Sequence, residues 1–135
     1  MTQRTLVLLK PDAVRRGLVG DILSRFEAKG LTTVAMDQRS ITAETADRHY
    51  AEHVEKDFYP PLRAFVTSGP LVAMVLEGDD VVDVVRAING ATDGRKATPG
   101  TIRGDLSLSN RENLVHGSDS ADSAEREIAI WFPAL

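Results

Sequence analysis

Leu71-Val72-Ala73-Met74-Val75-Leu76 is the longest apolar run of the chain. A run of this length is typical of a strand buried on both faces, and it is far below the roughly 18 residues that span a bilayer. Three more strands are predicted around it: an apolar one over Thr5 to Leu9, a partly alternating one over Val34 to Ile41 and a brief one over Asn113 to His116. The sequence therefore predicts four strands and no membrane insertion.

Helical patterns lie between these strands. Apolar residues repeat at helical spacing over Val19 to Phe26, ahead of Gly30, and again over Val81 to Ile88, ahead of Gly90. Ala124, Ile128 and Trp131 form a stripe in the last segment. Strands alternating with helices place the chain in the α+β or α/β class, and the order leaves the direction of the strands open.

Composition indicates one globular domain over residues 1–135. The chain has 42% hydrophobic and 27% charged residues, with a net charge of -4, which is an ordinary soluble balance. No cysteine is present, which excludes a disulfide scaffold and a thiolate metal site and favours the cytoplasm. Lys and Arg do not cluster as an extended duplex-binding surface requires.

The segment from Asn89 to Arg111 is rich in glycine and carries Arg95, Lys96 and Arg103. Irregular connections of this length are usually functional or disordered. Its glycines allow close backbone approach and its cations suit an anionic ligand, so the segment is either a binding loop or a mobile surface loop.

His116 is the first candidate for chemistry. A neutral imidazole is a nucleophile near pH 7, and the flanking Gly117 leaves room for a bulky partner. Glu127 shares the apolar face of the last helix, and a buried carboxylate needs a partner. If that partner is His116, the carboxylate holds one ring nitrogen, and the other nitrogen keeps a free lone pair with a defined direction. The alternatives are a structural histidine and a salt bridge from Glu127 to Lys or Arg.

Cations and aromatic residues give further candidates. Lys10 closes the first strand, and with Arg86 and Arg103 it would make a phosphate clamp, although each could also be a solvated surface charge. Lys56-Asp57-Phe58-Tyr59 places two aromatic rings before Pro60-Pro61. These rings could stack a base or belong to the core.

A helix is predicted from about Ala43, with Ala46, His49, Tyr50 and His53 on one face. His49-Tyr50-Ala51-Glu52-His53 reads as H-x-x-E-H, the string of inverted zinc peptidases. A catalytic zinc also needs a third protein ligand and a large cleft. The alternative is a partly exposed histidine pair, with the Tyr50 hydroxyl turned into a pocket.

Four segments together resemble one family, the nucleoside diphosphate kinases, over essentially the whole chain. They are Thr5 to Asp12, Thr67 to Pro70, Pro99 to Asp105 and Asn113 to Ser120. The resemblance implies a ferredoxin-like α/β sandwich with an antiparallel four-stranded sheet, assembled as a homo-oligomer, either a tetramer or a hexamer. It also implies transfer of the γ-phosphate of a nucleoside triphosphate to a nucleoside diphosphate, with Mg²⁺ as cofactor and a phosphohistidine intermediate.

The same resemblance assigns roles to residues. It implies that Nδ1 of His116 takes the phosphate, that Glu127 holds the other ring nitrogen and that Ser118 supports them. Contacts to phosphates or ribose would come from Lys10, Tyr50, Arg86, Thr92, Arg103 and Asn113. Phe58 would stack on the base, Lys56 would reach the β-phosphate, and Asp119 would lie near Mg²⁺, through water.

The chain departs from the family pattern at Asp57, Pro60-Pro61 and Gly94, which puts the local shape of the nucleotide cleft in doubt. The alternative to an enzyme is a noncatalytic ferredoxin-like module that binds nucleotides or RNA. Such a module would leave no covalent phosphate on the protein.

Overall fold

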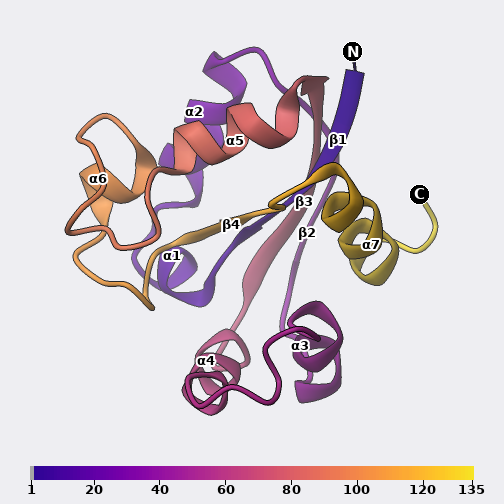
Figure 1. Cartoon of the computed structure of the whole chain (residues 1–135). Coiled ribbons are helices and arrows are strands. Elements are labelled where there is room, and N and C mark those ends of the chain that lie inside the picture. Colours follow the sequence, from indigo (N-terminus) through magenta and orange to yellow (C-terminus); the bar gives the residue numbers. More distant parts are fainter. Residues whose placement is uncertain (1) are drawn as a thin grey trace.

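The fold is built on a four-stranded antiparallel sheet with the strand order β2-β3-β1-β4. The computed structural model describes residues 2–135 (Figure 1). The strands are β1 (Thr2–Leu9), β2 (Thr32–Arg39), β3 (Leu71–Asp79) and β4 (Val115–Gly117). The four predicted strands and the antiparallel sheet are confirmed.

The short strand β4 begins later than the sequence predicts. Val115 pairs with Leu9 and Gly117 with Val7, whereas Asn113 and Leu114 precede the ladder. Leu114 has a φ of 73°, in the left-handed region, which a regular strand does not use. The predicted strand over Asn113 to His116 is therefore wrong at its start, because the chain turns sharply there.

Both faces of the sheet are buried, which explains the uninterrupted apolar runs. Val7, Leu9 and Met74 point to one face, while Leu6, Leu8 and Val75 point to the other. Helices cover both sides: α2 and α5 lie on the first face and α7 on the second (Figure 1). Trp131 of α7 fills the second core and is 2% exposed.

Seven helices surround the sheet among residues 2–135. They are α1 (Pro11–Arg15), α2 (Val19–Ala28), α3 (Ala43–His49), α4 (Tyr59–Val66), α5 (Val81–Asn89), α6 (Ile102–Leu106) and α7 (Ala121–Trp131). The predicted patterns before Gly30 and Gly90, and the last stripe, correspond to α2, α5 and α7. α1 begins at Pro11, where the sequence allows a new helical turn to begin, whereas α4 and α6 were not predicted. Pro60-Pro61 lies in the first turn of α4, where a missing N–H costs nothing, and α6 interrupts the expected long loop.

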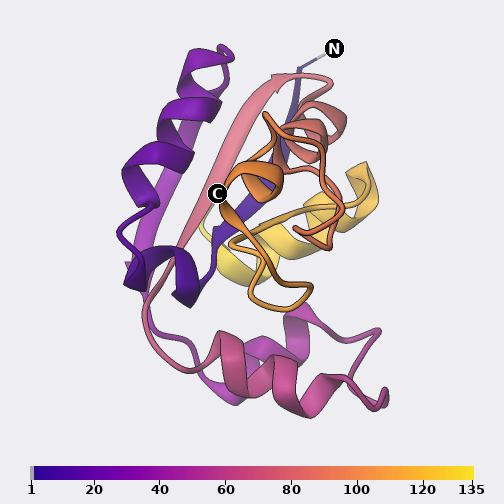
Figure 2. The same ribbon diagram turned by 90° about the vertical axis from the view of Figure 1, so that its left-hand side faces the viewer.

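The pair α3 and α4 packs beyond one end of the sheet (Figure 2). The Tyr59 hydroxyl donates a 2.6 Å hydrogen bond to Asp47 and joins the two helices. α3 ends at His49, with Tyr50 as its C-cap, so His53 lies in the following turns. The predicted helix face that carries both His49 and His53 is therefore wrong.

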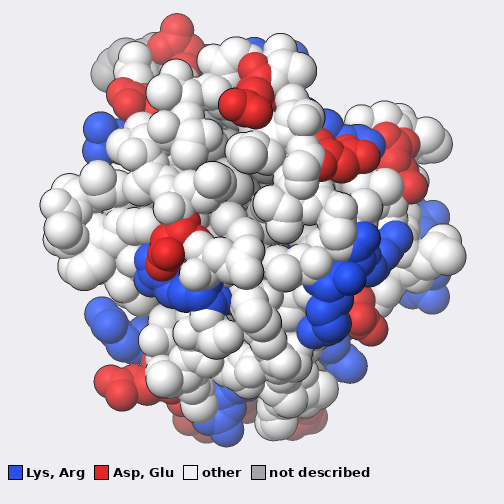
Figure 3. Space-filling view, turned by 180° about the vertical axis from the view of Figure 1, so that it is seen from behind, with Lys and Arg blue, Asp and Glu red and all other residues white. Residues whose placement is uncertain are grey.

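The surface carries mixed charge. On the face shown in Figure 3, Lys and Arg groups are interspersed with Asp and Glu and separated by uncharged residues. No helix among residues 2–135 is long and apolar enough to cross a membrane.

Candidate active site

A cavity of about 680 Å³ opens between the α3–α4 end of the molecule and β4. It brings together ten of the twelve residues to which the resemblance assigns a role: Lys10, Tyr50, Phe58, Arg86, Thr92, Arg103, Asn113, His116, Asp119 and Glu127. Five cations line it, Lys10, Arg86, Arg103, Arg111 and Arg126, against three acids, Glu52, Asp119 and Glu127. A chain with a net charge of -4 thus presents a cationic cavity that suits an anion.

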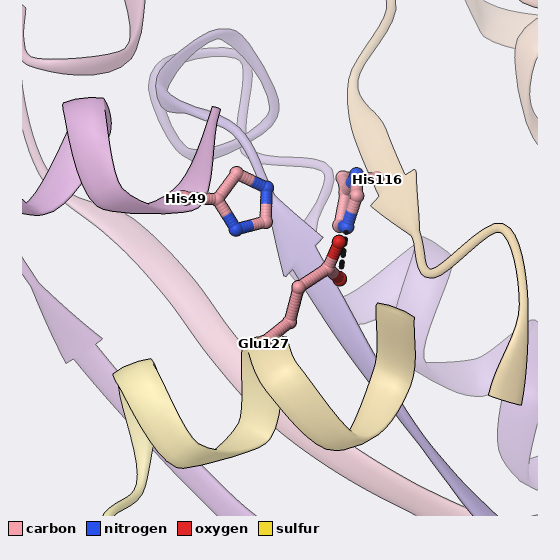
Figure 4. A group of neighbouring side chains, drawn as sticks. All are labelled: His49, His116 and Glu127. Atoms are coloured by element: carbon pink, nitrogen blue, oxygen red, sulfur yellow. Dashed lines mark hydrogen bonds and ion pairs between the residues drawn. The ribbon is translucent and has the colours of Figure 1, made fainter. Parts of the chain in front are cut away.

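His116 lies at the centre of the hydrogen-bonded group in this cavity. Its Nε2 is 2.8 Å from Oε1 of Glu127, which is 5% exposed. Ser118 donates to the same carboxylate oxygen at 2.7 Å, and its own oxygen accepts from the Leu6 amide at 3.2 Å. A carboxylate only accepts, so Nε2 carries the proton and Nδ1 keeps the lone pair. Figure 4 shows the second ring nitrogen of His116 directed away from Glu127.

The fold brings this pair together through β4 and α7, which follow one another. Leu8 of β1 pairs with His116, and the turn after β4 leads to Ser120, whose hydroxyl accepts from the Ser123 amide and caps α7. One and a half turns into the helix, Glu127 faces back toward the strand. The predicted contact between these two side chains is therefore present.

Gly117 is required for the packing of β4 against α5. A Cβ atom at this position would lie 2.9 Å from Cγ1 of Val85 and 3.0 Å from Nδ2 of Asn89. Only a residue without a side chain lets β4 lie this close to α5. Gly117 also lines the cavity beside His116, so the interpretation in which it leaves room for a bulky partner stays a prediction.

Lys10 is buried and reaches Asn113. Its Nζ donates to Oδ1 of Asn113 at 2.9 Å. Burial, reinforced by the charge of Arg103 and opposed by Asp12, lowers the pKa of Lys10 to about 8. Lys10 is therefore still charged at neutral pH, and an anion bound next to it would favour the charged form and raise its pKa again.

Arg103 is held by three backbone carbonyl groups. Its guanidinium donates to Asn113 at 3.1 Å, Gly90 at 2.8 Å and Val115 at 2.6 Å. Burial and the nearby Arg86 lower the pKa of Arg103 to about 10, so it stays charged at neutral pH. The loop from Asn89 to Arg111 is therefore anchored to β4 through a fixed cation.

Gly94, a departure from the family pattern, lies inside this loop. It is buried against Ser107, and a Cβ atom there would overlap the Ser107 backbone. The glycine thus allows two parts of the loop to pack together.

Aromatic residues line the other side of the cavity. Phe58 is 49% exposed, although it is large and apolar, and its ring is free to stack on a flat ligand. The Tyr50 hydroxyl is buried and has no hydrogen-bond partner among the described residues. Burial, with Glu127 nearby, raises the pKa of Tyr50, so the hydroxyl remains a donor.

Two predicted site residues do not line the cavity. Lys56 lies at its edge, with Nζ 3.0 Å from Nδ1 of His53 and 5.7 Å from the centre of the Phe58 ring. Ser118 is buried behind His116, where it contacts Glu127.

His49 belongs to the same group, although the sequence analysis considered it only as a zinc ligand or as one of a partly exposed histidine pair. The structure contradicts the partly exposed pair at His49, which is buried. Its ring is 3% exposed and packs edge-on against His116, with the centroids 4.6 Å apart. Trp131 donates its indole N–H to Nδ1 of His49 at 3.0 Å. Burial, followed by the charges around it, lowers the pKa of His49 well below its usual value, so the ring is neutral with its proton on Nε2.

His49, His116 and Glu127 have ligand-type atoms within 4.8 Å of one another (Figure 4). A metal-bound histidine must offer an unprotonated nitrogen. The lone pair of His49 is already used by Trp131, and Glu127 is used by His116 and Ser118. His53 instead faces Lys56. These partners argue against a zinc site, including the alternative that the H-x-x-E-H string suggests at His49 and His53.

Asp119 is the acid best placed for Mg²⁺. It is exposed in the cavity, and its pKa is lowered, chiefly by a hydrogen bond from Ser123 and also by the charge of Arg86, so the carboxylate is ionised. Magnesium is commonly held by one or two carboxylates together with substrate phosphates and water. One accessible carboxylate among the cations of the cavity fits this pattern.

Three lining residues were missed or misread by the sequence analysis. Arg126 donates to the carbonyl groups of Arg48 and His49 at 3.0 and 3.1 Å, and so ties the end of α3 to α7. Arg111 also lines the cavity. Arg126 precedes Glu127 directly, which was an available signal, whereas the contact of His49 with Trp131 spans 82 residues and has no local signature.

A family model, related sequences and solved structures all match this chain to the same family. A family model described as nucleoside diphosphate kinase matches residues 3–135. A nucleoside diphosphate kinase from Nocardioides sp. is 80% identical over the full length of both chains, and one from Rhodococcus erythropolis is 62% identical over 100% of this chain and 98% of its own. A solved nucleoside diphosphate kinase from Halobacterium salinarum, in complex with CDP, is 51% identical and superimposes with a TM-score of 0.95 over 98% of this chain and 88% of its own.

Proposed function

Because the chain belongs to the nucleoside diphosphate kinase family, we propose that its phosphotransferase activity runs through a covalent phosphate on Nδ1 of His116. The observation that carries this proposal is the 2.8 Å contact between Nε2 of His116 and Glu127 inside a cationic cavity. This contact holds Nε2 and leaves Nδ1 with a lone pair that points in a fixed direction, as an in-line attack on phosphorus requires.

Binding comes first. The base of the nucleotide stacks on the exposed ring of Phe58, and the phosphates extend toward Lys10, Arg86 and Arg103. Tyr50 and Thr92 donate hydrogen bonds to phosphates or ribose, and Lys56 reaches the β-phosphate from the rim. The amino group of Asn113 already donates to the carbonyl groups of Thr92 and Asn110, so Asn113 contacts the ribose through its amide oxygen, which accepts from a hydroxyl. A site that stacks on the base without hydrogen bonds to the base edges accepts many nucleotides. GDP and dGDP should therefore both be acceptors.

The transfer step then follows. The Nδ1 lone pair attacks the γ-phosphorus, an N–P bond forms, and the bond to the β-phosphate oxygen breaks with its electron pair on the departing diphosphate. Glu127 stabilises the positive charge that develops on the ring, and Ser118 holds Glu127 in place. The second diphosphate binds in the same place and takes the phosphate by the reverse step, which gives a ping-pong mechanism.

Mg²⁺ would neutralise charge on the phosphates when bound, with Asp119 as its protein partner through water. We also propose a cytoplasmic location, a single domain over residues 1–135 and self-association into a tetramer or hexamer. The edge strand β2 supports self-association, because it is mostly exposed and displays Met36 at 52% exposure.

The test is steady-state and single-turnover kinetics with ATP and GDP on the wild type and His116→Asn. We expect parallel double-reciprocal lines for the wild type and no transfer by His116→Asn, with its ADP affinity retained. Intersecting lines, or turnover by a folded His116→Asn protein, would overturn the proposal. A noncatalytic binding module would bind ADP and transfer nothing even as the wild type.

A further inference from the structure

The chain turns sharply two residues before His116. Leu114 is fully buried and has a φ of 73°, and the Val115 amide donates to the Asn113 carbonyl at 2.8 Å. An i to i+2 hydrogen bond with a positive φ at the middle residue defines a γ-turn of the rarer, strained kind. Such a conformation persists only where the surrounding structure holds it.

Asp12 of α1 provides one of the two hydrogen bonds that hold Leu114. Its Oδ2 accepts from the Leu114 amide at 3.1 Å, and the Lys10 amide donates to the Leu114 carbonyl at 2.8 Å. Both polar groups of the strained residue are therefore fixed by the segment that follows β1. Asp12 is only 3% exposed, and its other oxygen has no hydrogen-bond partner among residues 2–135.

The turn sets the positions of groups on both sides of it. On the Asn113 side, the amide oxygen accepts from Lys10 and the backbone carbonyl accepts from Arg103. On the Val115 side, the carbonyl accepts from Arg103 at 2.6 Å, and the next residue is His116. A relaxed backbone at Leu114 would therefore displace the amide, the guanidinium and the imidazole together.

We propose that Asp12 is a positioning residue for phosphotransfer, which accepts a hydrogen bond from the Leu114 amide and so holds the γ-turn that aims Asn113 and His116 into the cavity. Asp12 does not line the cavity, so it acts through these residues. The inference rests on the proposed role of His116 as phosphate carrier.

Asp12 could also act through its charge, which opposes the loss of the Lys10 proton. Three variants separate the two effects. Asp12→Asn keeps an acceptor oxygen and removes the charge, Asp12→Glu keeps the charge and displaces the acceptor by one methylene, and Asp12→Ala removes both. Asp21→Ala is the matched control, because Asp21 is an exposed acid on α2 that pairs with Arg25.

The experiment measures single-turnover phosphorylation of the full-length protein by saturating Mg²⁺-ATP, together with ADP affinity and thermal unfolding. We expect Asp12→Asn to stay within about threefold of the wild-type rate, and Asp12→Glu and Asp12→Ala to fall by about tenfold or more. ADP affinity should change less than the rate, and Asp21→Ala should match the wild type.

Two results would overturn the inference. One is a folded Asp12→Ala or Asp12→Glu protein that is phosphorylated as fast as the wild type. The other is an Asp12→Asn protein slowed as much as Asp12→Ala, which would assign the effect to charge. Asp12→Asn preserves the shape of the side chain, and if the other two variants do not fold, an Asp12→Asn protein slowed by about tenfold or more against the wild type overturns the inference. A wild-type protein that takes no phosphate on His116 would instead refute the proposed function.

Discussion

The indole nitrogen of Trp131 donates to Nδ1 of His49 across 3.0 Å in the second core. An indole N–H can only donate, so this bond fixes the proton of the neutral His49 ring on Nε2. A buried tryptophan of the sheet core thereby decides the tautomer of a ring that packs against His116. One hydrogen bond therefore links the packing of the second core to the protonation of a ring that contacts His116.

The first prediction concerns this bond. Trp131→Phe releases Nδ1 of His49, so the ring can present Nε2 unprotonated beside His116 and Glu127. We expect Zn²⁺ to inhibit phosphotransfer by the variant at concentrations about tenfold lower than for the wild type. The free energy of unfolding should also fall by about 1–3 kcal/mol, since a hydrogen bond and packed volume are lost.

Zinc titrations of activity in constant Mg²⁺ check this prediction, and denaturant unfolding gives the stability. The variant assayed without Zn²⁺ is the control. Equal sensitivity of the two proteins to Zn²⁺ would contradict the role given to Trp131.

The second prediction compares the two groups behind the imidazole. Glu127→Gln can still accept from Nε2 of His116 but no longer stabilises positive charge on the ring. We expect its single-turnover phosphorylation to slow on the order of tenfold to a hundredfold. Ser118→Ala should slow it by only about threefold, because Ser118 acts on the carboxylate and not on the ring. An equal loss in both variants would show that the charge of Glu127 is not what matters.

The third prediction is a pH dependence of nucleotide binding. The pKa of Lys10 is lowered to about 8, so the side chain is charged below that pH and loses its charge above it. A bound phosphate favours the charged form, and binding above pH 8 therefore takes up a proton. ADP affinity should fall at least about fivefold between pH 7.5 and pH 9.5.

Isothermal titration of ADP over this range measures the effect. Lys10→Arg keeps a charge throughout, so its affinity should stay flat with pH even if it is weaker overall. A wild-type affinity that does not change with pH would contradict the assignment to Lys10.

The fourth prediction tests the packing of β4 on α5. Gly117→Ala places a Cβ atom 2.9 Å from Val85 and forces β4, with His116, away from the helix. We expect a loss of about 1–3 kcal/mol in the free energy of unfolding together with slower phosphotransfer. Gly20→Ala is the control, because no atom lies within 4 Å of the added Cβ, and an alanine in α2 should stabilise the protein by about 0.5–1 kcal/mol.

Much of the fold follows from local pattern. The apolar runs of β1 and β3, and the helical spacing in α2, α5 and α7, are visible in the sequence because each element buries a continuous face. α4 was missed because Pro60-Pro61 was interpreted as a break, although proline is compatible with the first turn of a helix. The start of β4 was misplaced because nothing in the sequence marks a positive φ at a leucine.

The candidate site was likewise predictable only in part from the sequence. The pairing of Glu127 with His116 was predicted because a carboxylate on an apolar helix face needs a buried partner. The roles of Asp12 and Trp131 were not predicted, because each acts on a residue at least 82 positions away, through a contact that only the folded chain creates. Motif resemblance identified the groups that face the cavity and Ser118 behind them, but gave no role to Asp12 or Trp131.

The most direct test of the account is to identify which ring nitrogen of His116 carries phosphate after incubation with Mg²⁺-ATP. Phosphorus NMR of the ¹⁵N-labelled protein, with nucleotide removed, distinguishes the two positions, and addition of GDP tests whether the phosphate moves on. The account predicts phosphate on Nδ1, with Nε2 still bound to Glu127, and its loss to GDP as GTP forms. Phosphate on Nε2, or none on His116 in a protein that turns over, would contradict it.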